Sequence, residues 1–143
     1  MWQRLRWWRM ADEMAADFAT KYPAQSDAEF LAECGLADAP VAALAVRRSV
    51  ATYGMVAPDH IRSGHGCPGA LMELSGWDSL DFLEWVFELE RELGPGARVE
   101  RSWFDGLSSP VTVRDLAWAV HRRWPPGQPQ DTEPGATPRG GST

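Results

Sequence analysis

The predicted fold is decided by the stretch Gly76-Trp77-Asp78-Ser79-Leu80-Asp81-Phe82-Leu83-Glu84, which runs on as Trp85-Val86-Phe87-Glu88-Leu89-Glu90-Arg91-Glu92-Leu93-Gly94. Asp78 is a good helix N-cap, and Asp81 three residues later has the spacing of a capping box. The glycines on either side of Pro95 then end the helix. We therefore expect an amphipathic helix from Ser79 to Leu93. The residues expected to face its core are Leu83, Val86, Leu89 and Leu93.

Ser79 is the hydroxyl with the best defined setting in the chain. It stands at the predicted start of the helix, where unpaired backbone N–H groups and the positive end of the helix dipole favour negative charge. A phosphate attached to this serine would therefore be well accommodated.

Three other helices are predicted before this motif. The first covers Trp2 to about Thr20, and a short one runs from Ala28 to Cys34, capped by Ser26 or Asp27 and ended by Gly35. The third opens at Asp38-Ala39-Pro40 and continues to about Tyr53, where Gly54 terminates it. The expected core residues of these segments are Leu5, Trp8, Met14, Phe18, Val41, Leu44, Ala45, Val50 and Tyr53. A long connection then leads to Gly76, with Val56 and Ile61 as packing residues and a loose, glycine-rich stretch from Ser63 to Gly69.

The chain after the motif is also predicted to be helical up to Trp124. A helical turn is expected between Val99 and Asp105, and a last helix is capped by Thr112 with Asp115 three residues on. From residue 125 onward the sequence is dominated by Pro, Gly, Ser, Thr and Gln, which predicts disorder. The expected fold is therefore all-α, with a helical extension at 1–37, a helical bundle at 38–124 and a disordered tail at 125–143.

The motif and this order of helices resemble those of an acyl or peptidyl carrier protein. The family's motif is Gly-x-Asp-Ser-Leu followed by an acidic amphipathic helix, and the resemblance extends over roughly Asp38 to Trp124. The matching residues are Gly76, Asp78, Ser79, Leu80, Asp81, Glu84, Leu89 and Glu90. The Val-Thr-Val-Arg-Asp-Leu segment that begins at Val111 resembles the start of the family's fourth helix, and the resemblance implies a four-helix bundle.

The resemblance also implies a function without catalysis. Ser79 would carry 4′-phosphopantetheine taken from coenzyme A, and the arm would hold an acyl or aminoacyl group as a thioester. Asp78 would help to dock the phosphopantetheinyl transferase, which supplies the base and the Mg²⁺. Other implied partners are an acyl-activating ligase and acyl-processing enzymes. Partner enzymes would bind two kinds of residue on this helix. The apolar anchors would be Leu80 and Phe82, and the acidic face would consist of Asp81, Glu84 and Glu88.

Composition narrows the possible partners and compartments. The chain has 143 residues and a net charge of −6, and Leu71 to Asp105 holds nine acidic residues against three arginines. Nucleic acid needs clustered Lys and Arg, so it is not expected as a partner. There is no apolar run of membrane-spanning length and no secretion signal, and the two cysteines predict reduced thiols, so a cytoplasmic protein is expected. The Trp-rich start with Arg4, Arg6 and Arg9 could contact an anionic membrane, although packing on its own domain is favoured.

Several alternatives remain open at the level of sequence. The acidic helix face could be merely solvated, and the chain could be an unmodified carrier-like scaffold that acts through this helix. Ser79 with His60 or His121 could form a hydrolase triad, but the chain has no Gly-x-Ser-x-Gly elbow. His60, His65 and Cys67 have no recognised zinc spacing, so no metal site is expected. The pathway stays open between primary fatty acid synthesis, secondary metabolism and the modification of lipids or polysaccharides.

Overall fold

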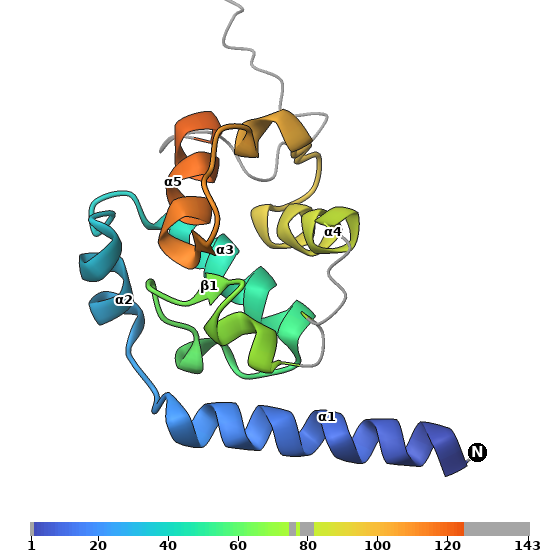
Figure 1. Ribbon diagram of the computed structural model, residues 1–143. Coiled ribbons are helices and arrows are strands. Elements are labelled where there is room, and N and C mark those ends of the chain that lie inside the picture. Colours follow the sequence, from blue (N-terminus) through green and yellow to red (C-terminus); the bar gives the residue numbers. More distant parts are fainter. Residues whose placement is uncertain (1, 75–76, 78–81, 125–143) are drawn as a thin grey trace, which may run out of the picture.

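The structure, a computed structural model, describes residues 2–74, 77 and 82–124, with side chains from residue 9 onward (Figure 1). Its five α-helices are α1 (Trp2–Lys21), α2 (Asp27–Cys34), α3 (Pro40–Gly54), α4 (Phe82–Leu93) and α5 (Val113–Arg123). The 3₁₀ helices are η1 (Pro58–His60), η2 (Ala70–Glu73) and η4 (Arg101–Phe104), and the short strands are β1 (Gly66–Cys67) and β2 (Val111–Thr112). The described part of the chain is therefore mostly helical, as the sequence predicts. The predicted tail at 125–143 lies outside the described residues.

Helix α3 is the centre of the fold, because α2, α4 and α5 all pack against it. Most of its side chains are small, so the neighbouring helices can approach closely. Its buried residues are Ala42, Ala43, Ala45, Val46, Arg47, Ser49, Val50, Ala51 and Gly54. The expectation that Val41 faces the core is wrong, since its side chain is 39% exposed.

Two predicted helix starts are confirmed by reciprocal capping boxes. The Ser26 hydroxyl accepts the Glu29 N–H at 3.1 Å, while the Glu29 carboxylate accepts the Ser26 N–H. Thr112 and Asp115 form the same pair at the start of α5, with distances of 3.1 and 3.0 Å. Each box satisfies two backbone donors that a helix start leaves unpaired.

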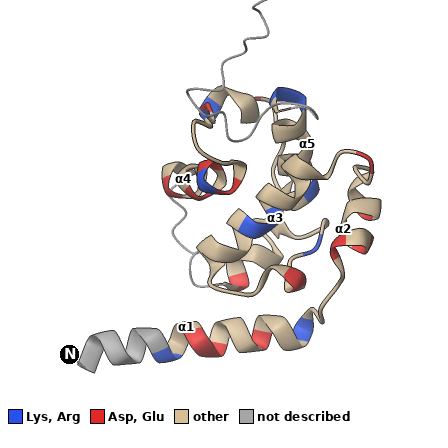
Figure 2. Cartoon of the chain, turned by 180° about the vertical axis from the view of Figure 1, so that it is seen from behind, with Lys and Arg blue, Asp and Glu red and all other residues tan. Residues whose placement is uncertain are grey.

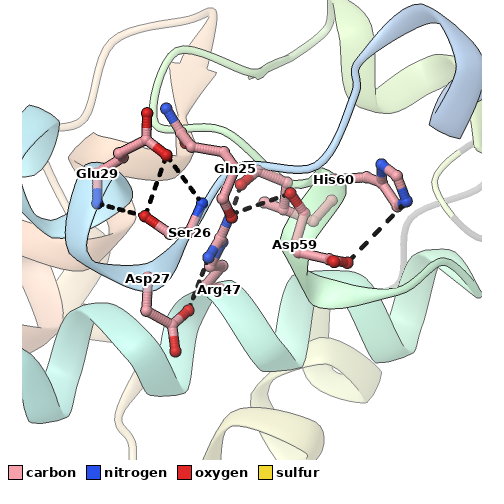
Figure 3. Close-up of polar contacts among 8 residues, drawn as sticks. Gln25, Ser26, Asp27, Glu29, Arg47, Asp59 and His60 are labelled. Carbon is pink, nitrogen blue, oxygen red and sulfur yellow. Dashed lines mark hydrogen bonds and ion pairs between the residues drawn. The ribbon is translucent and has the colours of Figure 1, made fainter.

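A buried arginine of α3 joins two other segments to this helix, which the sequence did not predict. The Arg47 side chain is 1% exposed and its guanidinium donates to the carbonyls of Gln25, Asp59 and Ile61 at 2.8, 3.1 and 3.0 Å. It also pairs with the Asp27 carboxylate at 2.7 Å (Figure 3). A single side chain thus ties the start of α2 and the η1 turn to α3.

The glycine-rich stretch predicted as a loose loop is ordered around a two-stranded antiparallel ladder. Gly66 pairs with Thr112 and Cys67 with Val111, which brings this stretch to the start of α5. The His65 side chain is buried, and its Nδ1 accepts the Arg62 N–H at 3.0 Å. The Val113 N–H donates to the His65 carbonyl at 2.9 Å, so the stretch is tied to the bundle by its backbone.

Helix α1 lies at the edge of the molecule, and its first turns extend beyond the other helices (Figure 1). Its last turn is anchored: Phe18 is buried as predicted, and the rings of Phe18 and Tyr22 pack on His65 with centroids at 5.1 and 4.3 Å. Lys21 adds an ion pair to Glu73 at 2.9 Å. Leu5 and Trp8, which were also expected to face the core, lie where side chains are not described.

Candidate functional site

The candidate site is centred on the segment Asp78–Asp81, which lies between Trp77 and the first residue of α4 in the sequence. Four of its predicted site residues, Asp78, Ser79, Leu80 and Asp81, lie outside the described residues. Phe82, Glu84 and Glu88 are described, and all three belong to α4. The described residues that flank the segment are Trp77 before it and Phe82 after it.

Trp77, which immediately precedes the segment, is fixed in the core. Its side chain is 3% exposed, its Nε1 lies 3.4 Å from the Val50 carbonyl, and its ring meets Tyr53 edge-on at 5.1 Å. Gly54 makes the space for it, because a Cβ there would lie 3.0 Å from Trp77 Nε1 and 2.7 Å from Leu74 Cδ1. Gly54 therefore serves close packing within α3, whereas Met55 is the residue with a positive φ, 64°, that caps the helix.

The inner face of α4 is built on Trp85. This residue is 1% exposed and donates from Nε1 to the Ser49 hydroxyl of α3 at 3.0 Å. The other buried residues of the helix are Val86, Leu89 and Leu93, as predicted. The prediction that Leu83 faces the core is wrong, since it is 55% exposed. The larger indole two positions on takes the core position, which turns Leu83 outward.

An apolar cavity of about 180 Å³ lies beside the start of α4. Three of its aromatic rings, from Phe82, Trp85 and Phe104, contact one another with centroids 5.2 to 5.3 Å apart, in T-shaped arrangements. Its lining among the described residues is Cys67, Leu71, Trp77, Phe82, Trp85, Phe104, Leu107, Val111 and Leu116. Both described residues that flank the Asp78–Asp81 segment therefore line the same cavity.

The outer face of α4 combines acidic and large apolar side chains. Leu83 and Phe87 are 55% and 61% exposed, and Glu84 is exposed beside them. Phe87 and Glu88 line a groove of about 350 Å³ against the end of α3, where Glu88 pairs with Arg91 at 2.6 Å. Such a face presents large apolar side chains beside charged ones, which is the usual anatomy of a transient protein interface.

The two histidines of the connection pack against other parts of the fold. His60 Nδ1 lies 2.8 Å from the Tyr22 carbonyl, and burial lowers the pKa of His65 to about 4. Burial raises the pKa of the Cys34 thiol to about 11 and also raises the pKa of Cys67. Among the described residues, no group of three or more His, Cys, Asp and Glu side chains is arranged to hold a metal ion.

Sequence reasoning missed Phe87 and the cavity. The exposed position of Phe87 follows once Trp85 and Leu89 are assigned inward, because a residue two positions from each lies on the opposite side of a helix. The cavity has no local sequence signal, since its walls come from α4, η4 and both strands.

Comparison of the chain with protein-family models, with curated proteins and with solved structures gave no match in any of the three. None of the helices in the described part of the chain has the length and apolar character that crossing a membrane requires.

Proposed function

We propose that the chain is an acyl carrier protein, with 4′-phosphopantetheine attached to Ser79 as a phosphodiester. The arm, when attached, supplies a thiol that holds an acyl or aminoacyl group as a thioester. In this proposal α3, α4, η4 and α5 correspond to the four helices of a carrier bundle. The chain itself performs no chemistry; it presents Ser79 to the transferase and later presents the cargo to other enzymes.

The main observation in support of this proposal is the packing of α4 against α3. Trp85 and three aliphatic residues bind its inner face to α3, whereas Glu84 and Phe87 on its outer face are exposed. Trp77 is anchored before the Asp78–Asp81 segment, and Phe82 packs on Trp85 and Phe104 after it. The described chain is therefore packed into the fold immediately before and immediately after the segment that carries the proposed attachment site.

The cavity at the start of α4 supports the same proposal. A short acyl chain would gain from transfer into an apolar site, by about 0.8 kcal/mol for each buried CH₂ group. Both residues that flank the Ser79 segment line this cavity, so the attachment site and the cavity are close along the chain.

The outer face of α4 indicates what kind of partner would dock. Its acidic residues Glu84 and Glu88 match a basic rim, and Phe87 matches an apolar pocket within that rim. Charge complementarity of this kind raises association rates, and a central aromatic anchor supplies most of the affinity. The same face would serve an unmodified scaffold, so the modification of Ser79 decides between the two functions.

The test is the intact mass of the full chain after incubation with coenzyme A, Mg²⁺ and a broad-specificity phosphopantetheinyl transferase. The proposal predicts the gain of one phosphopantetheinyl group. Ser79→Ala should gain nothing, while the matched control Ser75→Ala, four residues earlier, should be loaded like the natural chain. Absence of any gain in a chain shown to be folded would favour the scaffold function.

A further inference from the structure

The outer side of α5 carries a cleft that the proposed carrier function does not use. Its volume is about 380 Å³, and no described residue of α4 contributes to it. The lining residues are Leu107, Arg114, Asp115, Trp118 and Arg122. The acidic positions of α4 and the basic positions of α5 lie on different parts of the molecule (Figure 2).

The spacing of three lining residues places them on one face of the helix. Arg114, Trp118 and Arg122 follow one another at intervals of four, so an indole stands between two guanidinium groups. The two arginines are separated by about 12 Å along the helix axis, at 1.5 Å for each residue. Their flexible side chains can approach a common ligand from both ends of the cleft.

The positive charge of this cleft is not neutralised within the described part of the chain. Both arginines are exposed, and neither has a carboxylate oxygen within ion-pair distance among the described residues. Asp115 also lines the cleft, but its carboxylate accepts the Thr112 N–H at 3.0 Å as part of the helix cap. Two cations therefore face one anion that is already hydrogen-bonded.

The position of Arg114 is unfavourable for helix stability. It lies in the first turn of α5, where the positive end of the dipole disfavours a cation, whereas Arg122 lies in the last turn, where a cation is stabilised. An anion bound at this end would be attracted both by Arg114 and by the dipole.

Trp118 gives the cleft a fixed aromatic wall. Its Nε1 donates to the Cys34 carbonyl of α2 at 2.8 Å, which holds the ring in one orientation. The Arg122 guanidinium lies 5.9 Å from the ring centroid, within the range of a cation–π contact. A flat ligand could pack on the half-buried indole while its charged groups reach the two arginines.

We propose that this cleft binds a phosphorylated ligand with a flat aromatic ring, the chemistry of a nucleotide. Arg114 and Arg122 would hold the phosphate oxygens, because guanidinium groups form paired, charge-assisted hydrogen bonds with phosphate. Trp118 would stack on the ring, as indoles do on nucleic acid bases. The volume of the cleft lies in the range of small-molecule sites. It suits one small ligand better than an acidic peptide, which needs a longer groove.

Calorimetric titration of the full chain with ADP, pyrophosphate and adenosine tests this assignment. ADP should bind at least about tenfold more tightly than either half alone, since phosphate and ring contacts both contribute. Arg114→Gln and Arg122→Gln should each weaken ADP binding about tenfold, as expected for loss of a charge-assisted hydrogen bond. Arg123→Gln is the matched control, because this exposed arginine neighbours Arg122 but does not line the cleft.

A further variant tests the aromatic wall. Trp118→Leu should reduce ADP binding to the level of pyrophosphate, and its melting temperature checks that the fold survives loss of the bond to Cys34. If this variant unfolds, the two arginine variants alone decide. The proposal would be overturned by no ADP binding at millimolar concentration, or by equal weakening of ADP binding in Arg123→Gln and Arg122→Gln. It would also be overturned if the chain bound an acidic peptide but did not bind ADP. Ser79→Ala should bind ADP normally, which separates this site from the proposed carrier function.

Discussion

Replacing Arg47 with methionine should cost more stability than any single surface substitution in the chain. The guanidinium of Arg47 donates to three backbone carbonyls, and its side chain is almost entirely buried. Methionine has a similar length but no donor, so the carbonyls of Gln25, Asp59 and Ile61 lose this partner. Figure 3 shows that the arginine reaches the Gln25–Asp27 segment and Asp59 from one side chain.

The magnitude follows from counting these contacts. The Gln25 and Ile61 bonds are buried, and leaving a buried polar group unsatisfied costs about 1–3 kcal/mol. The ion pair adds little, because the Asp27 side chain is 55% exposed and exposed pairs contribute about 0–1 kcal/mol. We expect a total loss of about 3–5 kcal/mol, a large part of the stability of a typical domain. Arg47→Lys should lose less, since it keeps the charge and some of the donors.

Urea unfolding followed by tryptophan fluorescence measures this difference. Arg48→Met is the matched control: it lies next in α3, is exposed and should change the free energy of unfolding by less than about 0.5 kcal/mol. Hydrogen exchange should show the loss first in α2 and η1, the segments that Arg47 ties to α3. A loss below about 1 kcal/mol for Arg47→Met, or equal losses at positions 47 and 48, would refute the reasoning.

Three other substitutions test the remaining parts of the account. Gly54→Ala should destabilise the fold by about 1–3 kcal/mol in urea unfolding, because the new Cβ would lie 2.7 Å from Leu74 Cδ1; a neutral result would show that Leu74 and Trp77 can move aside. Phe87→Ser should change the free energy of unfolding by less than about 0.5 kcal/mol but slow loading by the transferase about tenfold. The control Val41→Ser, on the exposed side of α3, should change the rate of loading little. The folded-state pKa of His65 is lowered to about 4 from 6.5, so the unfolded chain binds more protons between these values. Stability should therefore fall by about 3 kcal/mol as pH drops through this window. His65→Asn should remove that part of the pH dependence, and an unchanged difference between pH 7 and pH 4 would contradict the assignment.

Local signals in the sequence were sufficient for the starts of α2 and α5 and for the end of α2. The capping pairs Ser26–Glu29 and Thr112–Asp115 act within four residues, so a short window of sequence contains both partners. The same holds for Gly35, whose φ of 75° ends α2. Helix boundaries that depend on such short-range hydrogen bonds can be predicted from the sequence without knowledge of the fold.

Contacts between distant segments could not be read in this way. Arg47 resembles an ordinary surface residue in sequence, because its partners are backbone carbonyls that the fold brings together from two distant segments. Leu83 and Trp85 both fit an apolar helix face, and only the packing against Ser49 decides between them. The pairing of Gly66 and Cys67 with β2 likewise depends on residues more than forty positions away.

The candidate site likewise has features that a local sequence pattern predicts and features that depend on packing. Its motif and its acidic residues are local features, so the sequence alone indicates them. The exposed Phe87, the aromatic cavity and the cleft beside Trp118 depend on how α4, η4 and α5 are packed, and no local pattern predicts them.

The central claim is that Ser79 carries the phosphopantetheine arm, and peptide fragmentation tests it most directly. Trypsin cleavage of the loaded chain after Arg62 and Arg91 should release one peptide that contains Ser63, Ser75 and Ser79. The account predicts that the added phosphopantetheinyl mass is found on Ser79 and on neither of the other serines. An unmodified peptide from a folded, transferase-treated chain, or a modification on Ser63 or Ser75, would contradict it.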